Sequence, residues 1–254
     1  MAADAIIELK DVAKTYEESV EALMGINLRL PHAGLSTLLG PSGCGKTTLL
    51  KIIAGLIPPS RGEVWVRGQR VQGPGPERAF VFQDFALLPW ANVLRNVAFG
   101  LELRGVAKDE REEIARKHID EVGLKSFESS YPHQLSGGMR QRVGLARALT
   151  VDADIILMDE PFSSVDEQTR RKFQEELLDL LRHRRKTVIF VTHSIEEAVY
   201  LSDRIVLLSP RPGTISQVIQ PNISKEGKNP DEIRRDKNYL DAVDGIWQIL
   251  KQYV

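Results

Sequence analysis

The sequence is poor in the features that mark secreted, nucleic-acid-binding and membrane-spanning proteins. Its one cysteine, Cys44, excludes an internal disulfide bond and fits a reducing compartment. The 34 basic and 35 acidic residues give a net charge of −1, which offers no electrostatic basis for binding nucleic acid or anionic lipid. No apolar run approaches the roughly 20 residues that cross a bilayer, and residues 1–10 lack the pattern of a secretory signal. We therefore expect a chain without its own membrane span and no nucleic-acid partner.

Short apolar segments alternate with helical patterns along most of the chain. Apolar residues make up 42% of the sequence, enough for one large domain or one domain with an inserted lobe. The alternation predicts an α/β fold with a mainly parallel sheet covered on both faces. The predicted strands are 6–9, 26–30, 35–39, 63–66, 80–82, 155–158, 188–191 and 205–208. The predicted helices are 47–54, an inserted helical lobe at about 88–150, one around 173–181 and a terminal one at 239–250.

Four polar or glycine-rich segments follow predicted strands directly. They are 40–48, Gln83, Asp159–Glu160 and His193. Because ligands of such sheets bind outside the carboxyl ends of the strands, we expect these segments to converge on one site.

The first segment matches the phosphate-loop pattern G-x-x-x-x-G-K-[ST]. In this loop, glycines let backbone N–H groups turn toward phosphate oxygens, and the following helix directs its N-terminal dipole at the anion. We predict that Lys46 reaches the β- and γ-phosphates and that Thr47 offers its hydroxyl to Mg²⁺. A chance match is the alternative, but the position between a strand and a helix favours the motif. The predicted nucleotide-binding residues are Gly40, Pro41, Ser42, Gly43, Cys44, Gly45, Lys46, Thr47 and Thr48.

An apolar strand that ends in two acids supplies a candidate metal partner and a candidate base. Asp159 is expected to hold Mg²⁺ through its water shell, and Glu160, one residue on, to accept a proton from attacking water. Taken alone, the two acids could equally be a solvated strand end.

The segment 135–142 reads Leu-Ser-Gly-Gly-Met-Arg-Gln-Arg. Ser136 is a candidate helix cap, and Gly137 and Gly138 bare the N–H groups that follow it, which makes a second anion site. One nucleotide cannot easily use both sites of one chain. Two chains paired head to tail can, if each offers its second site to the other's nucleotide. An ordinary capped helix is the alternative.

Together these segments resemble the ATPase of ABC (ATP-binding cassette) transporters, from about residue 6 to residue 212. The resemblance implies the ABC ATPase form of the P-loop NTPase fold, with an N-terminal antiparallel β portion. It implies ATP and Mg²⁺ as cofactors, and a homodimer, or a pair with a similar ATPase, around two ATP molecules. It also implies docking on membrane permease subunits at the cytoplasmic face of the inner membrane and, indirectly, an extracytoplasmic solute-binding protein. We expect an ABC ATPase domain at 1–215 and a C-terminal tail at 216–254.

Roles for single residues also follow from the resemblance. Gln83 resembles the glutamine that contacts Mg²⁺ and attacking water, and His193 the histidine that reaches the γ-phosphate. Asp166 resembles the aspartate that links the two sites of the dimer, and Tyr16 the aromatic residue that stacks on adenine. Two departures stand out. Met139 replaces the usual glutamine of the family's signature segment, which corresponds to residues 135–141 here, and we expect this change to leave function intact. Ser163-Ser-Val-Asp166 replaces the usual Ser-Ala-Leu-Asp.

Three further segments resemble bacterial importers for nitrate, sulfonates, taurine and related small solutes. They are 87–90, 96–100 and 209–213. The apolar stretch Phe85, Leu87, Leu88, Pro89 and Trp90 is also a candidate groove for a short permease helix. Its alternative role is to seat the helical lobe on the sheet.

Two other classes of protein stay open at this point. ABC ATPases of DNA repair and translation share the ATP chemistry, but they carry long coiled coils or two cassettes, and neither is visible here. A simple P-loop kinase or GTPase would not require the serine-glycine-glycine segment or His193.

Overall fold

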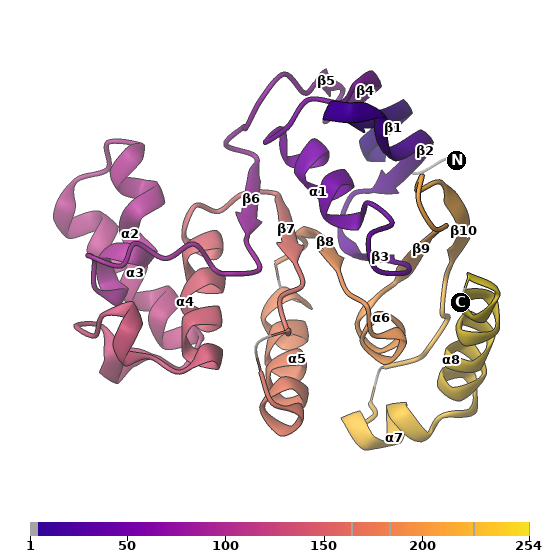
Figure 1. Cartoon of the computed structure of the whole chain (residues 1–254). Coiled ribbons are helices and arrows are strands. Elements are labelled where there is room, and N and C mark those ends of the chain that lie inside the picture. The colour runs from indigo at the N-terminus through magenta and orange to yellow at the C-terminus, as the bar shows by residue number, and fades with distance from the viewer. Residues whose placement is uncertain (1–4, 164, 183, 226, 254) are drawn as a thin grey trace. The chain divides into compact units, whose positions relative to one another are not determined.

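The computed structural model describes residues 5–163, 165–182, 184–225 and 227–253, so Ser164 of the predicted segment 163–166 lies outside the described residues. The chain forms two compact units. Unit 1 is Met1–Gly75 with Arg185–Val254, and unit 2 is Pro76–Arg184. The elements of both units are labelled in Figure 1.

Unit 1 begins with an antiparallel sheet of order β2-β1-β4-β5. Its strands are β1 (Ala5–Tyr16), β2 (Val20–Pro31), β4 (Arg61–Val66) and β5 (Gln69–Arg70). The antiparallel N-terminal portion is thus confirmed. β1 and β2 extend well beyond the predicted strands. Their pairing continues past register shifts into polar residues, where the alternation of apolar side chains that predicts a strand is lost.

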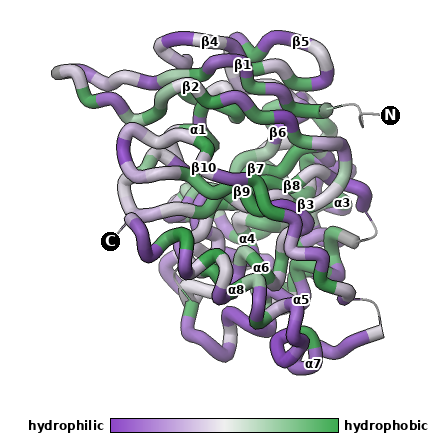
Figure 2. Tube along the Cα trace, turned by 90° about the vertical axis from the view of Figure 1, so that its right-hand side faces the viewer, coloured by the Kyte–Doolittle hydropathy of each residue, from purple (hydrophilic) through white to green (hydrophobic). Residues whose placement is uncertain are grey.

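The second sheet of unit 1 contains the parallel strands. β3 (Gly34–Leu39) pairs in parallel with both β8 (Thr187–Val191) and β9 (Arg204–Leu208), and β10 (Ile215–Ile219) pairs antiparallel to β9. All five residues of β8 are buried, and β8 and β9 are hydrophobic after their first residues, Thr187 and Arg204 (Figure 2). This agrees with the mainly parallel α/β fold that the sequence predicts.

Both chain segments of unit 1 contribute helices. α1 (Lys46–Ala54) follows β3, and α6 (Ile195–Leu201), α7 (Pro230–Arg235) and α8 (Lys237–Leu250) follow β8. In α8, Tyr239 and Ile246 are buried, and the Tyr239 hydroxyl donates to the carbonyl of Glu196 at the start of α6. The terminal helix was predicted from the sequence, whereas β10, α6 and α7 were not.

Unit 2 combines two parallel strands with the helical lobe. β6 (Arg78–Val81) pairs with β7 (Ile155–Asp159), and the helices are α2 (Val93–Leu103), α3 (Lys108–Glu121), α4 (Gly137–Thr150) and α5 (Glu167–Arg182). Short 3₁₀ turns lie at Lys125–Phe127 and Pro132–Gln134. Side-chain caps begin α2 and α4: Asn92 accepts from the N–H of Arg95 and Ser136 from that of Met139.

Candidate functional site

The phosphate-loop segment runs from the end of β3 to the start of α1. Gly43 and Gly45 have φ angles of 75° and 98°, in the left-handed region that glycine enters without steric cost. The ammonium group of Lys46 donates to the carbonyls of Gly40 and Pro41 at 2.8 and 2.9 Å. Lys46 is therefore curled back over the loop, and its charge stabilises the loop's own turn.

Two backbone segments support the phosphate loop from outside it. A Cβ added to Gly45 would lie 2.9 Å from the carbonyl oxygen of Ala22 in β2. One added to Gly213 would lie 2.0 Å from the carbonyl oxygen of Cys44. Gly213 in turn pairs with β2, since its N–H donates to Ala22 and its carbonyl accepts from the N–H of Met24. In the sequence, segment 209–213 is visible only as a family resemblance, and no sequence signal indicates this supporting role.

Cys44 is 1% exposed, and burial raises the pKa of its thiol. The thiolate is the reactive form of cysteine. Cys44 therefore has the surroundings of an inert, packed thiol within the loop.

Tyr16, the predicted adenine-stacking residue, lies at the end of β1 with 44% of its surface exposed. Its hydroxyl lies 3.2 Å from the hydroxyl of Thr48 in α1. The ammonium group of Lys14 lies 5.3 Å from the centre of its ring. Tyr16 is thus held near the phosphate-loop helix while one ring surface stays accessible.

In unit 2, the structure brings Gln83 and Glu160 together. β6 and β7 run in parallel with Val81 opposite Met158, so the residues after both strands emerge at the same edge. The Gln83 amide donates to the Glu160 carboxylate at 3.3 Å. Asp159, the last residue of β7, is 4% exposed. Glu160 has a φ of 47°, which is uncommon for a residue with a side chain.

The signature residues lie at the N-terminus of α4, as the sequence predicts. Ser136 is the N-cap, and Gly137 and Gly138 form the first turn. A Cβ at Gly138 would lie 3.1 Å from a methyl group of Val165, so the glycine permits close packing.

Asp166 is exposed. Its carboxylate caps α5 by accepting a hydrogen bond from the N–H of Thr169. That bond holds the pKa of the Asp166 carboxyl below its usual range. In the single chain, Asp166 therefore acts as a helix cap.

His193 is exposed two residues after β8. The turn that carries it is fixed by its neighbours. The Thr192 hydroxyl donates to the Glu197 carboxylate at 2.5 Å and accepts from the N–H of Ser194 at 3.1 Å. Ser194 then caps α6 by accepting from the N–H of Glu197. His193 therefore lies on a strand-to-helix turn that three hydrogen bonds hold together.

The apolar stretch after Gln83 is partly buried and partly exposed. Phe85 is 4% exposed, whereas Trp90 is 71% exposed. The amide of the buried Asn96 bonds to the N–H and carbonyl of Leu88 and to the carbonyls of Ala91 and Asn92. Phe85 therefore seats the segment on the lobe, and Asn96 fixes the turn that exposes Trp90.

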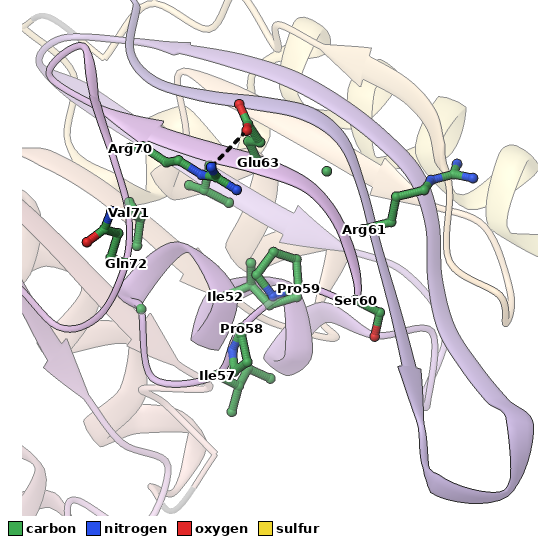
Figure 3. Close-up of a pocket in the computed structure, with 13 residues that line it drawn as sticks. Ile52, Ile57, Pro58, Pro59, Ser60, Arg61, Glu63, Arg70, Val71 and Gln72 are labelled. Atoms are coloured by element: carbon green, nitrogen blue, oxygen red, sulfur yellow. Dashed lines mark ion pairs between the residues drawn. The ribbon is translucent and has the colours of Figure 1, made fainter.

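Unit 1 also contains a cavity of about 570 Å³ that includes none of the predicted site residues (Figure 3). It lies between the end of α1 and the β4–β5 hairpin. Arg70 and Glu63 form an ion pair of 3.2 Å in its wall. Ile52 and Val64 contribute apolar surface.

A model of the "ABC transporter" family matches residues 23–163. An uncharacterised ABC transporter ATP-binding protein of Methanocaldococcus jannaschii is 52% identical over 222 residues, which cover 86% of this chain and 83% of that protein. This chain belongs to the ABC transporter family. It is an ATP-binding, ATP-hydrolysing subunit, as its phosphate loop and signature predict.

Two taurine import ATP-binding proteins are similar to this ABC ATPase over most of its length. That of Pseudomonas syringae pv. tomato is 46% identical over 94% of this chain and 93% of its own. That of Escherichia coli O6:K15:H31 is 47% identical over 86% and 87%.

Solved structures agree with the ABC ATPase fold. A dimeric ATP-binding cassette in a post-hydrolysis state, with ADP and phosphate bound, is 33% identical, with a TM-score of 0.76 over 84% of this chain and 98% of that one. A cassette from Clostridium perfringens, 22% identical with a TM-score of 0.77, covers 98% of both chains and supports the fold alone. Among the described residues, no helix of this ABC ATPase is long and apolar enough to span a membrane.

Proposed function

We propose that this ABC ATPase powers import of a small anionic or organic solute of the nitrate, sulfonate or taurine type. The observation that carries the proposal is the identity of 46–47% to taurine import ATP-binding proteins, which extends over 86–94% of the chain. The family-like segments 87–90, 96–100 and 209–213 support it. The first two are joined in the turn at Trp90, and the third lies against the phosphate loop.

For hydrolysis, Glu160 acts as the general base toward water and Gln83 orients that water. The hydrogen bond between the two side chains supports this pairing. Lys46 exchanges its loop carbonyls for the β- and γ-phosphates, and His193 reaches the γ-phosphate. Tyr16 stacks on adenine, and the phosphate is held by residues 40–48.

The donor set of the site suits Mg²⁺, which prefers oxygen ligands. The proposed ligands are the hydroxyl of Thr47 in unit 1 and, in unit 2, the amide oxygen of Gln83 and the carboxylate of the buried Asp159. When bound, the ion would neutralise charge on the phosphates. The role of this chain is to supply the oxygens that hold it.

Two chains pair around two ATP molecules in this proposal. The capped N-terminus of α4, with Ser136, Gly137 and Gly138, faces the nucleotide of the partner, and Asp166 connects the two sites. The dimeric state of a cassette that is 33% identical supports the pairing.

The pair docks on separate permease subunits at the cytoplasmic face of the inner membrane, and a solute-binding protein delivers the solute. Trp90 and its turn are the proposed docking surface. We place the ATPase domain at residues 1–215 and a C-terminal tail at 216–254, a tail that includes nearly all of β10 and both α7 and α8.

The test of solute class is uptake into vesicles that contain the complete transporter with its own permease and binding protein. Labelled taurine, an alkanesulfonate and nitrate are compared, each with and without ATP. The proposal expects ATP-dependent accumulation of at least one of the three, abolished by Glu160→Gln. ATP-dependent uptake of none of them, by a complex that hydrolyses ATP, would contradict it.

A further inference from the structure

Arg147, near the end of α4, grips the backbone that follows Gln83. One Nη of its guanidinium donates to the carbonyl of Ala86 at 2.8 Å and the other to that of Phe85 at 2.5 Å. Both bonds are charge-assisted, and the planar fork of arginine suits two neighbouring acceptors. No motif in the sequence analysis assigns Arg147 a role.

The gripped residues have an unusual backbone. Phe85 and Ala86 have φ angles of 61° and 42°, and both carry side chains that disfavour the left-handed region. In an extended segment, successive carbonyls point to opposite sides, whereas in a turn of helical type they point the same way. The fork of Arg147 can therefore bind both carbonyls only while this conformation is kept.

The segment is anchored at both ends of the turn. The N–H of Phe85 donates to the carbonyl of Phe82, and the N–H of Leu88 donates to Asn96. Gln83 lies inside the first of these turns, and its amide reaches Glu160. The backbone conformation at Phe85 and Ala86 thus fixes the position of the Gln83 Cα atom, from which the side chain extends.

We propose that Arg147 is a positioning residue for ATP hydrolysis, which holds the left-handed turn after Gln83 and so keeps the Gln83 amide against Glu160. The proposal rests on the proposed roles of these two residues. Arg147 acts through the backbone of the turn and not through a contact of its own with the reacting atoms. It lies on the same helix as Ser136–Gly138, so the grip also ties the signature helix to Gln83.

Arg104 provides a matched control within unit 2. Its guanidinium also donates to two backbone carbonyls, those of Val151 at 2.8 Å and Pro76 at 3.2 Å, but neither belongs to the turn after Gln83. Arg104→Ala therefore removes the same kind of group and the same number of bonds. Loss of two backbone hydrogen bonds occurs in both variants, whereas loss of the turn after Gln83 is expected only in Arg147→Ala.

The experiment measures kcat, the KM and Kd for ATP, and amide hydrogen exchange of residues 83–88 in the full chain. We expect Arg147→Ala to lower kcat by about tenfold or more, as small misplacements of catalytic groups do, with the Kd for ATP within about twofold of the parent. Exchange at residues 83–88 should accelerate. Arg104→Ala should leave kcat and this exchange near parental values, and Arg147→Lys, which keeps one donor group, should fall between.

A rescue completes the test. Glycine enters the left-handed region freely, so Ala86→Gly should recover at least about threefold of the kcat lost in Arg147→Ala. Equal losses in Arg147→Ala and Arg104→Ala, no rescue, or unchanged exchange at 83–88 would each overturn the proposal. If Glu160→Gln and Gln83→Ala keep parental turnover, the proposed function fails instead, and the exchange comparison alone still decides whether Arg147 holds the turn.

Discussion

Among single residues, Glu160 gives the most specific prediction about ATP hydrolysis. Glu160→Gln keeps the size of the side chain and its contact with Gln83 but removes the basic carboxylate. We expect ATP hydrolysis to fall by about 10²-fold or more, because general base catalysis contributes at least that much, while the Kd for ATP stays near the parental value. Phosphate release and nucleotide titration measure the two quantities. The control is Glu167→Gln, an exposed carboxylate that pairs with Arg171, and equal turnover in both variants would remove Glu160 from the role.

Gln141 in α4 gives a prediction about thermal stability. It is 1% exposed, and neither atom of its amide has a hydrogen-bond partner among the described residues. An unsatisfied buried polar group costs about 1–3 kcal/mol, so Gln141→Leu should raise the melting temperature by a few degrees, at about 2–4 °C per kcal/mol for a chain of this size.

The control for this prediction is a second buried glutamine, Gln174, which does have an interaction partner. Gln174→Leu should lower the melting temperature. A fall in both variants would show that the Gln141 amide is satisfied.

Among the elements, the segment 209–213 should matter for nucleotide binding although it lies far from the phosphate loop in sequence. A methyl group at Gly213 would collide with the carbonyl of Cys44. We expect Gly213→Ala to weaken ATP binding by about tenfold or more, since displacing one backbone segment of a preorganised anion site disturbs several N–H donors at once. Gly245→Ala in α8, where a Cβ meets nothing within 4 Å, is the control. Unchanged ATP affinity in Gly213→Ala would mean that the loop does not depend on this support.

The turn at Trp90 should matter only in the assembled transporter. We expect Trp90→Ala with Leu88→Ser to leave folding and ATP binding of the chain intact and to abolish permease assembly and uptake, because exposed tryptophans are common binding hot spots. Trp247→Ala on α8, 52% exposed, is a matched control that should assemble normally. Normal uptake by the first variant, or its unfolding, would exclude the docking role.

Comparison of the elements with the sequence shows which parts of the fold and site could be predicted. The phosphate loop, the acids after β7 and the cap at Ser136 follow from local rules of glycine conformation, strand ends and helix capping, and the structure has each of these local features. The sequence could not predict the grip of Arg147 on Phe85 or the support of Gly213 beneath Cys44. Both join residues that are tens of positions apart, through backbone groups that every residue shares.

β10 and α6 escaped prediction for a different reason. Three of the five residues of β10 are exposed, so it shows no clear apolar alternation, and α6 has only seven residues, too few for a clear helical period. Short or weakly buried elements acquire their structure from the neighbours they pair with.

For the whole molecule, the proposed pairing of two chains predicts a change in size that depends on nucleotide. In Glu160→Gln, ATP is bound but not consumed, so the chain should elute as a dimer with ATP and Mg²⁺ and as a smaller species with ADP. Ser136→Arg, which places a bulky cation at the capped start of α4, should bind ATP and remain small. A monomer under all conditions would contradict the pairing through the signature segment.

The left-handed backbone at Glu160 implies that thermal stability and ATP hydrolysis place opposite demands on this position. At a φ of 47°, a side chain costs about 1–2 kcal/mol that glycine would avoid. Glu160→Gly should therefore raise the melting temperature while it abolishes hydrolysis, and a screen that rewarded heat resistance alone would favour an inactive chain. Under the proposed role of Glu160 as general base, selection for hydrolysis retains a carboxylate that selection for stability alone would remove.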